Sequence, residues 1–246
     1  MTALAALTER SLLAAARDGG LVFEIFSPVG YLVGFSLALH GLIDTGNTSY
    51  VQYLVPAVAL QSVVFVAMLT ADRAARDHLH GLGERLMTLP IAAAVPVSAR
   101  IIATLARAAL ALTVAIIAGY IFGFRMNGGP GYTVAFVVIT LLFGLAVALG
   151  ADALGSSTST PQGASHLLFV PQLLLFMLST GIAPESTFPP WLRPYVRNQP
   201  LSLVAETLRG LGHGQVTFSN LVPSLTWCAG MILVFGGITL RMQRRI

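Results

Sequence analysis

Six long apolar runs are the feature that most constrains what this chain can fold into. Each run approaches the roughly 20 apolar residues that an α-helix needs to cross a bilayer. A backbone in hydrocarbon must satisfy its own hydrogen bonds, and continuous apolar runs exclude the alternating pattern of a membrane β-barrel. The sequence therefore predicts an all-α membrane protein with six transmembrane helices. The runs cover residues 28–43, 54–71, 101–124, 132–151, 164–183 and 221–240.

Composition supports this class. Of 246 residues, 55% are hydrophobic and 10% are charged, against roughly 25% charged residues in an average soluble domain. The sequence contains no lysine, so all its basic side chains other than histidine are arginines. A P-loop ATPase and a lysine-nucleophile enzyme both need a lysine, so neither chemistry belongs to this chain alone. The single cysteine, Cys228, has no partner within the chain and excludes an internal disulfide.

The arginines fall mostly on alternate sides of the expected spans. The segments on the side of the N-terminus hold nine arginines, mostly in residues 72–100 and the C-terminal tail, whereas the segments on the other side hold four. The positive-inside rule therefore predicts a multi-pass protein of the cytoplasmic membrane with both termini in the cytoplasm. The arginines are spread along loops and tails rather than clustered with aromatic residues, so no nucleic-acid partner is expected.

Few polar side chains lie inside the runs, and the main ones are Gln61, Arg107 and Gln172. Arg107 lies about 10 Å along the third run at 1.5 Å per residue, so its side chain can reach the cytoplasmic surface. A functional ion pair within the membrane is the alternative. Small residues allow close packing and sliding of membrane helices, and the runs contain several. Examples are Gly119, Gly123, Gly144 and Gly150.

The first twenty residues predict an amphipathic helix along the cytoplasmic interface, ended by Gly19 and Gly20. A cleaved signal peptide is the rival interpretation. Glu24 interrupts the apolar region that would follow Arg17, and no small-residue cleavage site comes after it. The interfacial helix is therefore the stronger prediction.

Residues 72–100 are the best candidate for a docking surface on the cytoplasmic side. Residues 73–80 suit a short polar helix, Gly81 and Gly83 break it, and Pro90 ends a further turn or two. A solvated loop whose charges only orient the protein is the alternative. An apolar stripe favours docking, because a plain linker would not need one. The stripe consists of Leu79, Leu82, Leu86 and Leu89.

Residues 184–218 are too long for a turn and too polar for a span, so they are expected outside. Pro200 can begin an interfacial or re-entrant helix that Gly210 and Gly212 end. Trp191 and Tyr195 would anchor this region at headgroup depth, where it could close the outer end of a pathway. A passive lid is the alternative. The apolar face of the helix comprises Leu201, Val204, Leu208 and Leu211.

No catalytic or metal site emerges from the sequence. Asp152, Ser156 and His166 invite a serine-hydrolase interpretation, but the G-x-S-x-G elbow is absent. The five histidines are scattered over different segments and do not have metal-ligand spacing. They are His40, His78, His80, His166 and His213.

Two segments resemble the ABC-2 permease family. The cytoplasmic segment carries Gly81, Glu84-Arg85 and Leu89-Pro90, and the outer segment carries Phe188-Pro-x-Trp191 and Val196-Arg-Asn-Gln-Pro200, followed by Ala205-x-x-Leu-Arg209. The resemblance covers nearly the whole chain, as one domain over residues 1–246. Within the family it is similar to the daunorubicin-resistance-type permeases of actinobacteria, including mycobacterial permeases linked to export of phthiocerol dimycocerosate lipids.

The resemblance implies a permease subunit that exports a lipophilic drug or cell-envelope lipid and performs no bond chemistry. It would pair with a second, identical or related permease half and with two separate ATPase subunits. Those subunits would bind ATP and Mg²⁺, so this chain would hold no cofactor. Residues 72–77 depart from the more regular acidic-basic-glycine pattern of many relatives. A membrane scaffold without transport and a membrane-embedded enzyme are the alternatives.

By the same resemblance, two groups of residues carry the function. Coupling to the ATPase is assigned to Asp77, Gly81, Glu84, Arg85, Leu89 and Pro90, and the external gate to Pro189, Trp191, Asn198, Pro200 and Arg209.

Overall fold

The computed structural model describes residues 3–39, 49–79, 95–158 and 161–243. Every regular element within these ranges is helical, as the apolar runs predict. The elements are α1 (Ala3–Arg17), α2 (Gly20–Leu39), α3 (Tyr50–Leu79), α5 (Val95–Ile121), α6 (Pro130–Ser157), α7 (Pro161–Met177), the 3₁₀ helix η1 (Glu185–Thr187), α8 (Arg193–Asn198), α9 (Pro200–His213) and α10 (Phe218–Gln243).

Five of the described helices are long and apolar enough to cross a membrane: α2, α3, α5, α6 and α10. The sixth expected span corresponds to α7, whose apolar part, His166–Met177, is shorter than the others. The apolar run continues to residue 183, but the helix ends at Met177. Ser179 donates its hydroxyl to the Phe176 carbonyl at 2.8 Å, and the chain turns there. The structure thus shows an integral membrane bundle with five helices of spanning length.

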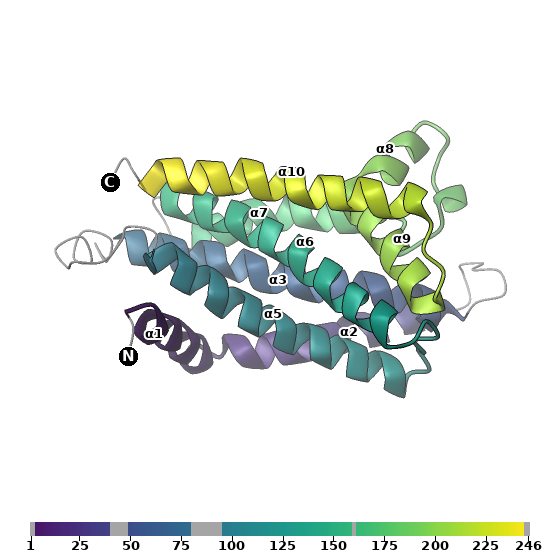
Figure 1. The fold of residues 1–246 in the computed structure, drawn as a ribbon, viewed down its shortest axis with the longest axis horizontal. Coiled ribbons are helices and arrows are strands. Elements are labelled where there is room, and N and C mark those ends of the chain that lie inside the picture. The colour runs from purple at the N-terminus through teal and green to yellow at the C-terminus, as the bar shows by residue number, and fades with distance from the viewer. Residues whose placement is uncertain (1–2, 40–48, 80–94, 159–160, 244–246) are drawn as a thin grey trace.

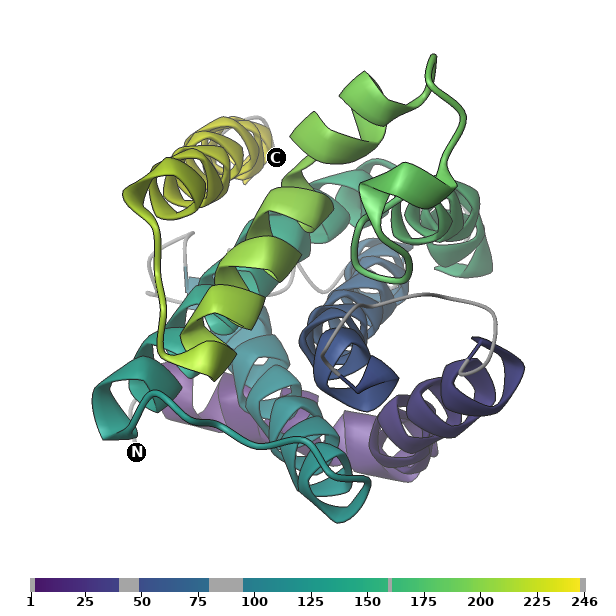
Figure 2. The same ribbon diagram turned by 90° about the vertical axis from the view of Figure 1, so that its right-hand side faces the viewer.

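The bundle has two distinct ends (Figure 1). The first, which we call the α1 end, holds α1 and the C-terminal end of α10. The opposite end, which we call the α9 end, holds α8 and α9. Figure 2 looks onto the α9 end and shows α9 lying across the ends of the longer helices. The first and last helices therefore place the described chain ends on the same side of the bundle.

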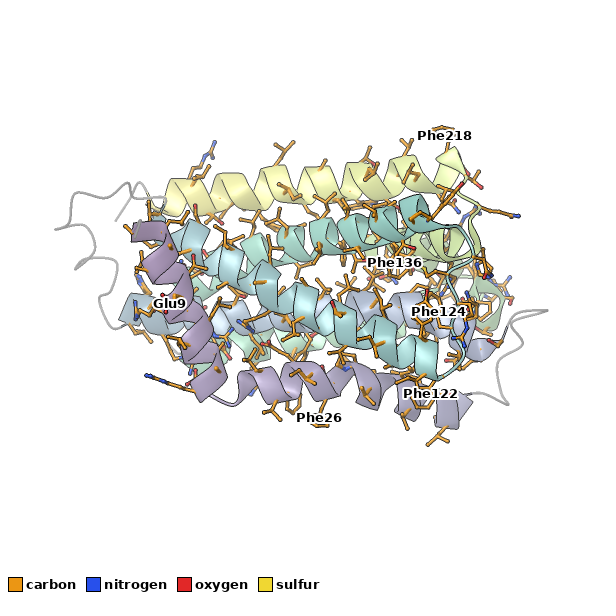
Figure 3. The ribbon with its side chains drawn as sticks, turned by 60° about the horizontal axis from the view of Figure 1, so that its bottom comes forward. Glu9, Phe26, Phe122, Phe124, Phe136 and Phe218 are labelled. Atoms are coloured by element: carbon orange, nitrogen blue, oxygen red, sulfur yellow. The ribbon has the colours of Figure 1, made fainter. Side chains whose placement is uncertain are left out.

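Helix α3 occupies the centre of the bundle. It contacts α2, α5, α6, α7 and α9, and 89% of its apolar window is buried, against 17% for α2 and 11% for α10. Phe124 and Phe136 pack inside, whereas Phe26 projects outward from α2 (Figure 3). Exposed apolar side chains on the outer helices suit a surface that faces lipid.

Glycines set how closely the helices approach. A Cβ atom at Gly144 would lie 2.1 Å from Val63 Cγ1, and one at Gly155 would lie 2.1 Å from the Ala71 carbonyl oxygen. Gly119 meets Val55 and Gly150 meets Phe235 in the same way. The packing role predicted for Gly119, Gly144 and Gly150 is confirmed. Gly123 differs, because its φ of 102° belongs to the turn after α5 and a Cβ there would meet nothing within 4 Å.

The first spanning helix begins earlier than its apolar run indicates. Gly19 adopts a left-handed conformation with φ of 71°, which separates α1 from α2 at Gly20. The apolar run from residue 28 is short for a span, and α2 reaches spanning length by including the residues before it, among them Glu24, which has only 1% of its surface exposed. The second spanning helix, α3, is also longer than its apolar run. It continues past the expected boundary at Ala71 and ends at Leu79.

Candidate functional site

Arg107 on α5 forms a buried ion pair with Glu24 on α2. Its Nε donates to Glu24 Oε2 at 3.0 Å, and its Nη2 donates to Glu24 Oε1. The two side chains are 3% and 1% exposed, respectively. The expectation that Arg107 extends to the membrane surface is therefore wrong, and the ion pair within the bundle is observed. Pairing removes most of the cost of placing either charge among apolar helices.

A second set of charges joins four helices at the α1 end. We call Arg10, Asp77, Arg100 and Asp152 the α1-end network. Arg100 on α5 donates from Nε to Asp152 Oδ1 of α6 at 2.8 Å and from Nη2 to Asp152 Oδ2 at 3.2 Å. Its Nη1 reaches Asp77 Oδ2 of α3 at 3.4 Å, and Arg10 of α1 lies 3.8 Å from Asp77 Oδ1.

Arg100 is the centre of this network. Its planar guanidinium group binds one carboxylate with two nitrogens and a second carboxylate with the third nitrogen. A lysine ammonium cannot supply this geometry. Asp152 is fully buried, whereas the Asp77 side chain is 27% exposed. The contact to Asp152 is thus shielded from water and salt, and the contacts to Asp77 lie at the rim.

The α1-end network holds the helices that lead into and out of residues 80–94. Helix α3 ends at Leu79 and α5 begins at Val95, and both are tied through Arg100 to α6. Asp77 is the one expected coupling residue that the structure describes. The other expected coupling residues lie outside the described residues; they are Gly81, Glu84, Arg85, Leu89 and Pro90.

Sequence reasoning did not identify Arg100 and Asp152 as partners. Asp152 was noted only as a weak catalytic candidate, and Arg100 only as a charge in the segment from residue 72. A carboxylate at the end of an apolar run was a signal that it needs a buried partner. The partner lies 52 residues away in sequence, so only helix packing identifies it.

At the α9 end, Arg209 fastens α9 to the rest of the bundle. Its Nε donates to the Tyr53 carbonyl of α3 at 3.0 Å, and its Nη2 donates to the carbonyls of Thr180 and Gly181 after α7, the latter at 3.0 Å. The guanidinium also lies 3.6 Å from the centre of the Tyr53 ring. Burial lowers the pKa of this guanidinium, but arginine stays charged at any physiological pH.

Polar side chains at the start of α9 complete this attachment. Gln199 donates from Nε2 to the Leu175 carbonyl at 3.2 Å, and the Ser202 hydroxyl accepts from the Thr180 backbone N–H at 3.0 Å. Pro200 is the first helical residue, as predicted, but α9 ends at His213 with Gly214 left-handed at φ of 73°. The predicted end at Gly210 and Gly212 is wrong, because the left-handed cap comes later. The predicted apolar face is confirmed, since Leu201, Val204, Leu208 and Leu211 are all buried.

The other residues expected at the external gate lie at the surface. Trp191 is 78% exposed, and Pro189 and Asn198 are also exposed. The Asn198 side chain donates to the Pro194 carbonyl of its own helix at 2.8 Å. Arg209 therefore belongs to the attachment of α9 and the partly buried Pro200 begins that helix, whereas Pro189, Trp191 and Asn198 lie at the outer rim.

Among the described side chains, no three of His, Cys, Asp or Glu converge as metal ligands would. Arg100 and Arg107 instead pair with carboxylates, and Arg209 binds backbone carbonyls. What the arrangement can do is hold helices together at defined points at each end of the bundle.

Comparison with known proteins identifies the family. The family described as ABC-2 type transporter matches residues 2–211. The chain is 31% identical to the doxorubicin resistance ABC transporter permease protein DrrB of Mycobacterium tuberculosis, over 93% of this chain and 84% of that protein. It is 29% identical to the daunorubicin resistance ABC transporter permease protein DrrB1 of Streptomyces coeruleorubidus, over 91% and 79%.

A further similarity is to the probable doxorubicin resistance ABC transporter permease protein DrrC of Mycobacterium tuberculosis, at 27% identity over 92% of this chain and 83% of that protein. The family match covers the helices from α1 to α8 and α9 as far as residue 211. This all-helical membrane protein therefore belongs to the ABC-2 type transporter family.

Proposed function

We propose that this chain is the permease subunit of an ABC exporter that moves a lipophilic drug or cell-envelope lipid outward across the cytoplasmic membrane. The observation that carries the proposal is similarity over more than nine-tenths of the chain to proteins named as drug-resistance permeases. The sequence contains no lysine, and a P-loop needs a lysine to bind ATP. This supports ATP hydrolysis in a separate subunit.

The exporter would contain two such bundles, identical or related, and two ATPase subunits that bind ATP and Mg²⁺. The α1 end would face the cytoplasm, because the arginine-rich segments gather there and cytoplasmic segments carry the excess of positive charge. Residues 80–94 join α3 to α5 at this end and would dock on the ATPase. In this arrangement Gly81, Glu84, Arg85, Leu89 and Pro90 would contact the ATPase, beside Asp77.

The α1-end network supports a path for the coupling. A displacement of residues 80–94 acts on the last turn of α3 and the first turn of α5, and Arg100 ties both to the buried Asp152 of α6. The three helices would therefore move together rather than bend separately. Such a motion would open and close the interface between the two bundles. The cargo would then cross by alternating or lateral access at that interface.

The α9 end would close the outer side of the pathway. Helix α9 lies across the ends of the longer helices and is held by Arg209 to α3 and to the segment after α7. A movement of α3 at the α1 end would reach this attachment along one continuous helix. The exposed Trp191 and the half-exposed Tyr195 would sit at headgroup depth beside it.

The experiment that tests the proposal is co-purification of the tagged full chain from its native host in mild detergent. Mass spectrometry then identifies the chains and lipids that accompany it. We expect an ABC ATPase, with or without a second permease, and an enriched lipophilic compound would identify the cargo class. Reproducible absence of any ATPase would overturn the exporter proposal in favour of a membrane scaffold.

The coupling assignment needs its own variants. Glu84→Ala and Arg85→Ala are expected to reduce ATPase association and export while the protein still inserts in the membrane. Arg197→Ala is the matched control, because Arg197 is exposed at the α9 end. Unchanged ATPase association and export in both coupling variants would overturn the assignment of residues 80–94.

A further inference from the structure

A cavity of about 250 Å³ lies between α1, α3 and α5 at the α1 end. Arginines dominate its polar lining. The five are Arg10, Arg73, Arg76, Arg100 and Arg107. A cavity of this size is smaller than the roughly 300–1,000 Å³ of sites that hold drug-sized ligands. It suits a small charged group rather than a whole lipophilic cargo.

Four of these arginines have carboxylate partners. Arg107 pairs with Glu24, Arg100 with Asp152 and Asp77, Arg10 with Asp77, and Arg76 with Asp18 at 3.8 Å. Arg73 differs from the other four. Its Nε and Nη1 atoms are buried and have no hydrogen-bond partner among the described residues.

Two buried donor nitrogens without acceptors are costly, at about 1–3 kcal/mol for each unsatisfied group and more for charged ones. Arg73 reaches from α3 to the beginning of α2, where its Nη2 would lie 3.2 Å from a Cβ atom at Gly20. Its guanidinium therefore lies beside the start of α2, with Nε and Nη1 buried, and Arg73 also lines the cavity. A planar fork with free donors in a cavity rich in arginine is matched by a phosphate group, which accepts two parallel hydrogen bonds.

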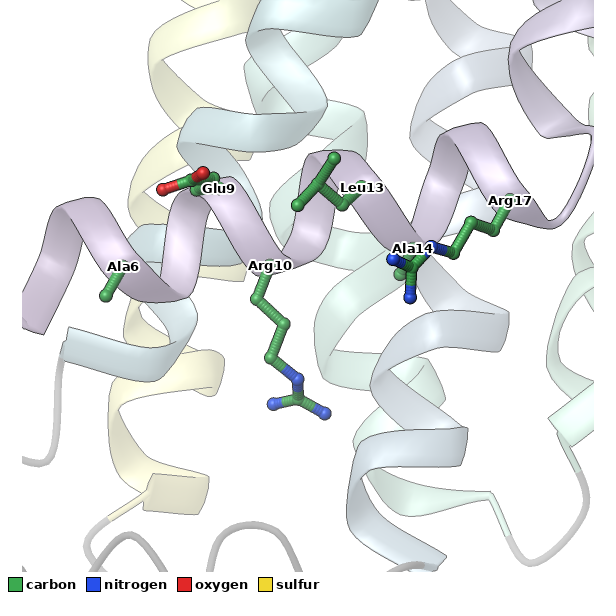
Figure 4. A pocket seen from close by; sticks show the side chains of 6 residues that line it. All are labelled: Ala6, Glu9, Arg10, Leu13, Ala14 and Arg17. Carbon is green, nitrogen blue, oxygen red and sulfur yellow. The ribbon is translucent and has the colours of Figure 1, made fainter.

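A hollow beside α1 shares lining residues with this cavity. It has a volume of about 390 Å³, and Arg10 and Ala14 line both the hollow and the cavity. Figure 4 shows Glu9 and Leu13 on one edge of α1 and Arg10 extending from the other. The N-terminal turns of α2, which follow α1 directly, expose apolar side chains. These are Val22 at 60%, Phe23 at 63% and Phe26 at 67%.

An apolar surface next to a cationic cavity fits an amphiphile with an anionic head. We propose that the arginine-lined cavity binds the phosphate group of an anionic phospholipid, whose acyl chains lie along α2. The lipid comes from the leaflet in which α1 lies. Binding would join α1, α3 and α5 through one shared headgroup next to the α1-end network.

The test uses the purified full chain with equal amounts of dioleoylphosphatidylglycerol and dioleoylphosphatidylcholine, and native mass spectrometry counts the lipids retained. We expect wild type to prefer phosphatidylglycerol and Arg73→Gln to weaken its binding by about tenfold. Arg241→Gln is the matched control, because Arg241 is an exposed arginine near the C-terminal end of α10 and does not line the cavity. It should keep the preference.

Thermal unfolding provides the second measurement and separates the sources of phosphate. Phosphatidylglycerol should raise the midpoint of wild type and of Arg241→Gln but not of Arg73→Gln, and inorganic phosphate should raise none of them. Stabilisation by inorganic phosphate alone would assign the cavity to a soluble anion and overturn the lipid proposal. Equal weakening in both variants would also overturn it, because binding would then follow surface charge.

If Arg73→Gln cannot be produced in folded form, the wild-type protein alone tests the proposal. Equal binding of phosphatidylglycerol and phosphatidylcholine by wild type would overturn it. Arg73→Lys then supplies the variant arm, because it keeps the charge and removes the fork. It is expected to bind less tightly than wild type. None of these measurements needs an ATPase or a cargo, so their failure would leave the exporter proposal standing.

Discussion

Glu24 on α2 and Arg107 on α5 form an ion pair inside the helical bundle, with both side chains almost fully buried. The pair explains why α2 can carry a charge in its first turns and still be apolar enough to cross a membrane. It also fixes the position of α2 relative to α5, because a charge that shifts along the helix would lose its partner.

Removing one member of this pair should destabilise the protein. Glu24→Gln is expected to lower the free energy of unfolding by about 3–5 kcal/mol, because Arg107 would keep a buried charge without a partner. Replacing both, with Glu24→Leu and Arg107→Met, should recover most of the loss. Unfolding in detergent, followed by circular dichroism, measures the difference. Glu9→Gln is the control on exposed α1, and a loss of equal size there would contradict the prediction.

The two aspartates bound to Arg100 should differ in their effect on stability. Asp152→Asn is expected to cost about 3–5 kcal/mol because Asp152 is fully buried and binds two nitrogens of Arg100. Asp77→Asn is expected to cost less than about 1 kcal/mol because its contacts are longer and its side chain is 27% exposed. Chemical unfolding of both variants side by side gives the comparison. Similar losses for the two would show that Arg100 is not centred on Asp152.

Arg209 should control how firmly α9 is attached. Arg209→Lys is expected to raise hydrogen exchange of residues 200–213 by about tenfold, because a lysine ammonium cannot reproduce the fork on three carbonyls or its stacking on Tyr53. Mass spectrometry of exchanged peptides measures this. The exposed Arg197→Lys serves as the control. If α9 stays equally protected in both, the attachment rests on its apolar face instead.

Gly155 should not tolerate a side chain. A Cβ atom there would lie 2.1 Å from the Ala71 carbonyl oxygen, which is backbone and cannot rotate away. Gly155→Ala is therefore expected to cost at least about 1–3 kcal/mol, as overpacking does. Gly237→Ala meets nothing within 4 Å and should be neutral or slightly stabilising. Thermal midpoints of the two variants in detergent test the contrast.

Much of the architecture could be predicted from local sequence pattern. Apolar runs indicate membrane helices wherever they occur, since lipid imposes the same demand on every span, and five helices of spanning length confirm this. The spacing of the apolar residues predicted the buried face of α9. The fixed φ of Pro200 predicted that this residue begins the helix. The prediction was less accurate where local pattern competes with turn geometry, as at the end of α7 after Met177.

The pairing of charges could not be predicted from local pattern. Glu24 and Arg107 are 83 residues apart, and Arg100 and Asp152 are 52 residues apart. From the sequence, Arg107 was expected to extend to the surface because its depth alone permits that. Which carboxylate faces which arginine depends on the rotation and height of each helix, and these are set by packing around α3.

The sequence by itself therefore determined the class of this protein, its apolar helices and the asymmetric distribution of arginines, because each follows from short-range pattern and from lipid as the solvent. Only the tertiary structure decided that Arg107 and Arg100 are paired, that Arg209 fastens α9, and that Arg73 faces a cavity with buried donors. The physical reason is that a buried charge is stabilised by the groups that packing brings within about 3 Å, and those groups come from other helices.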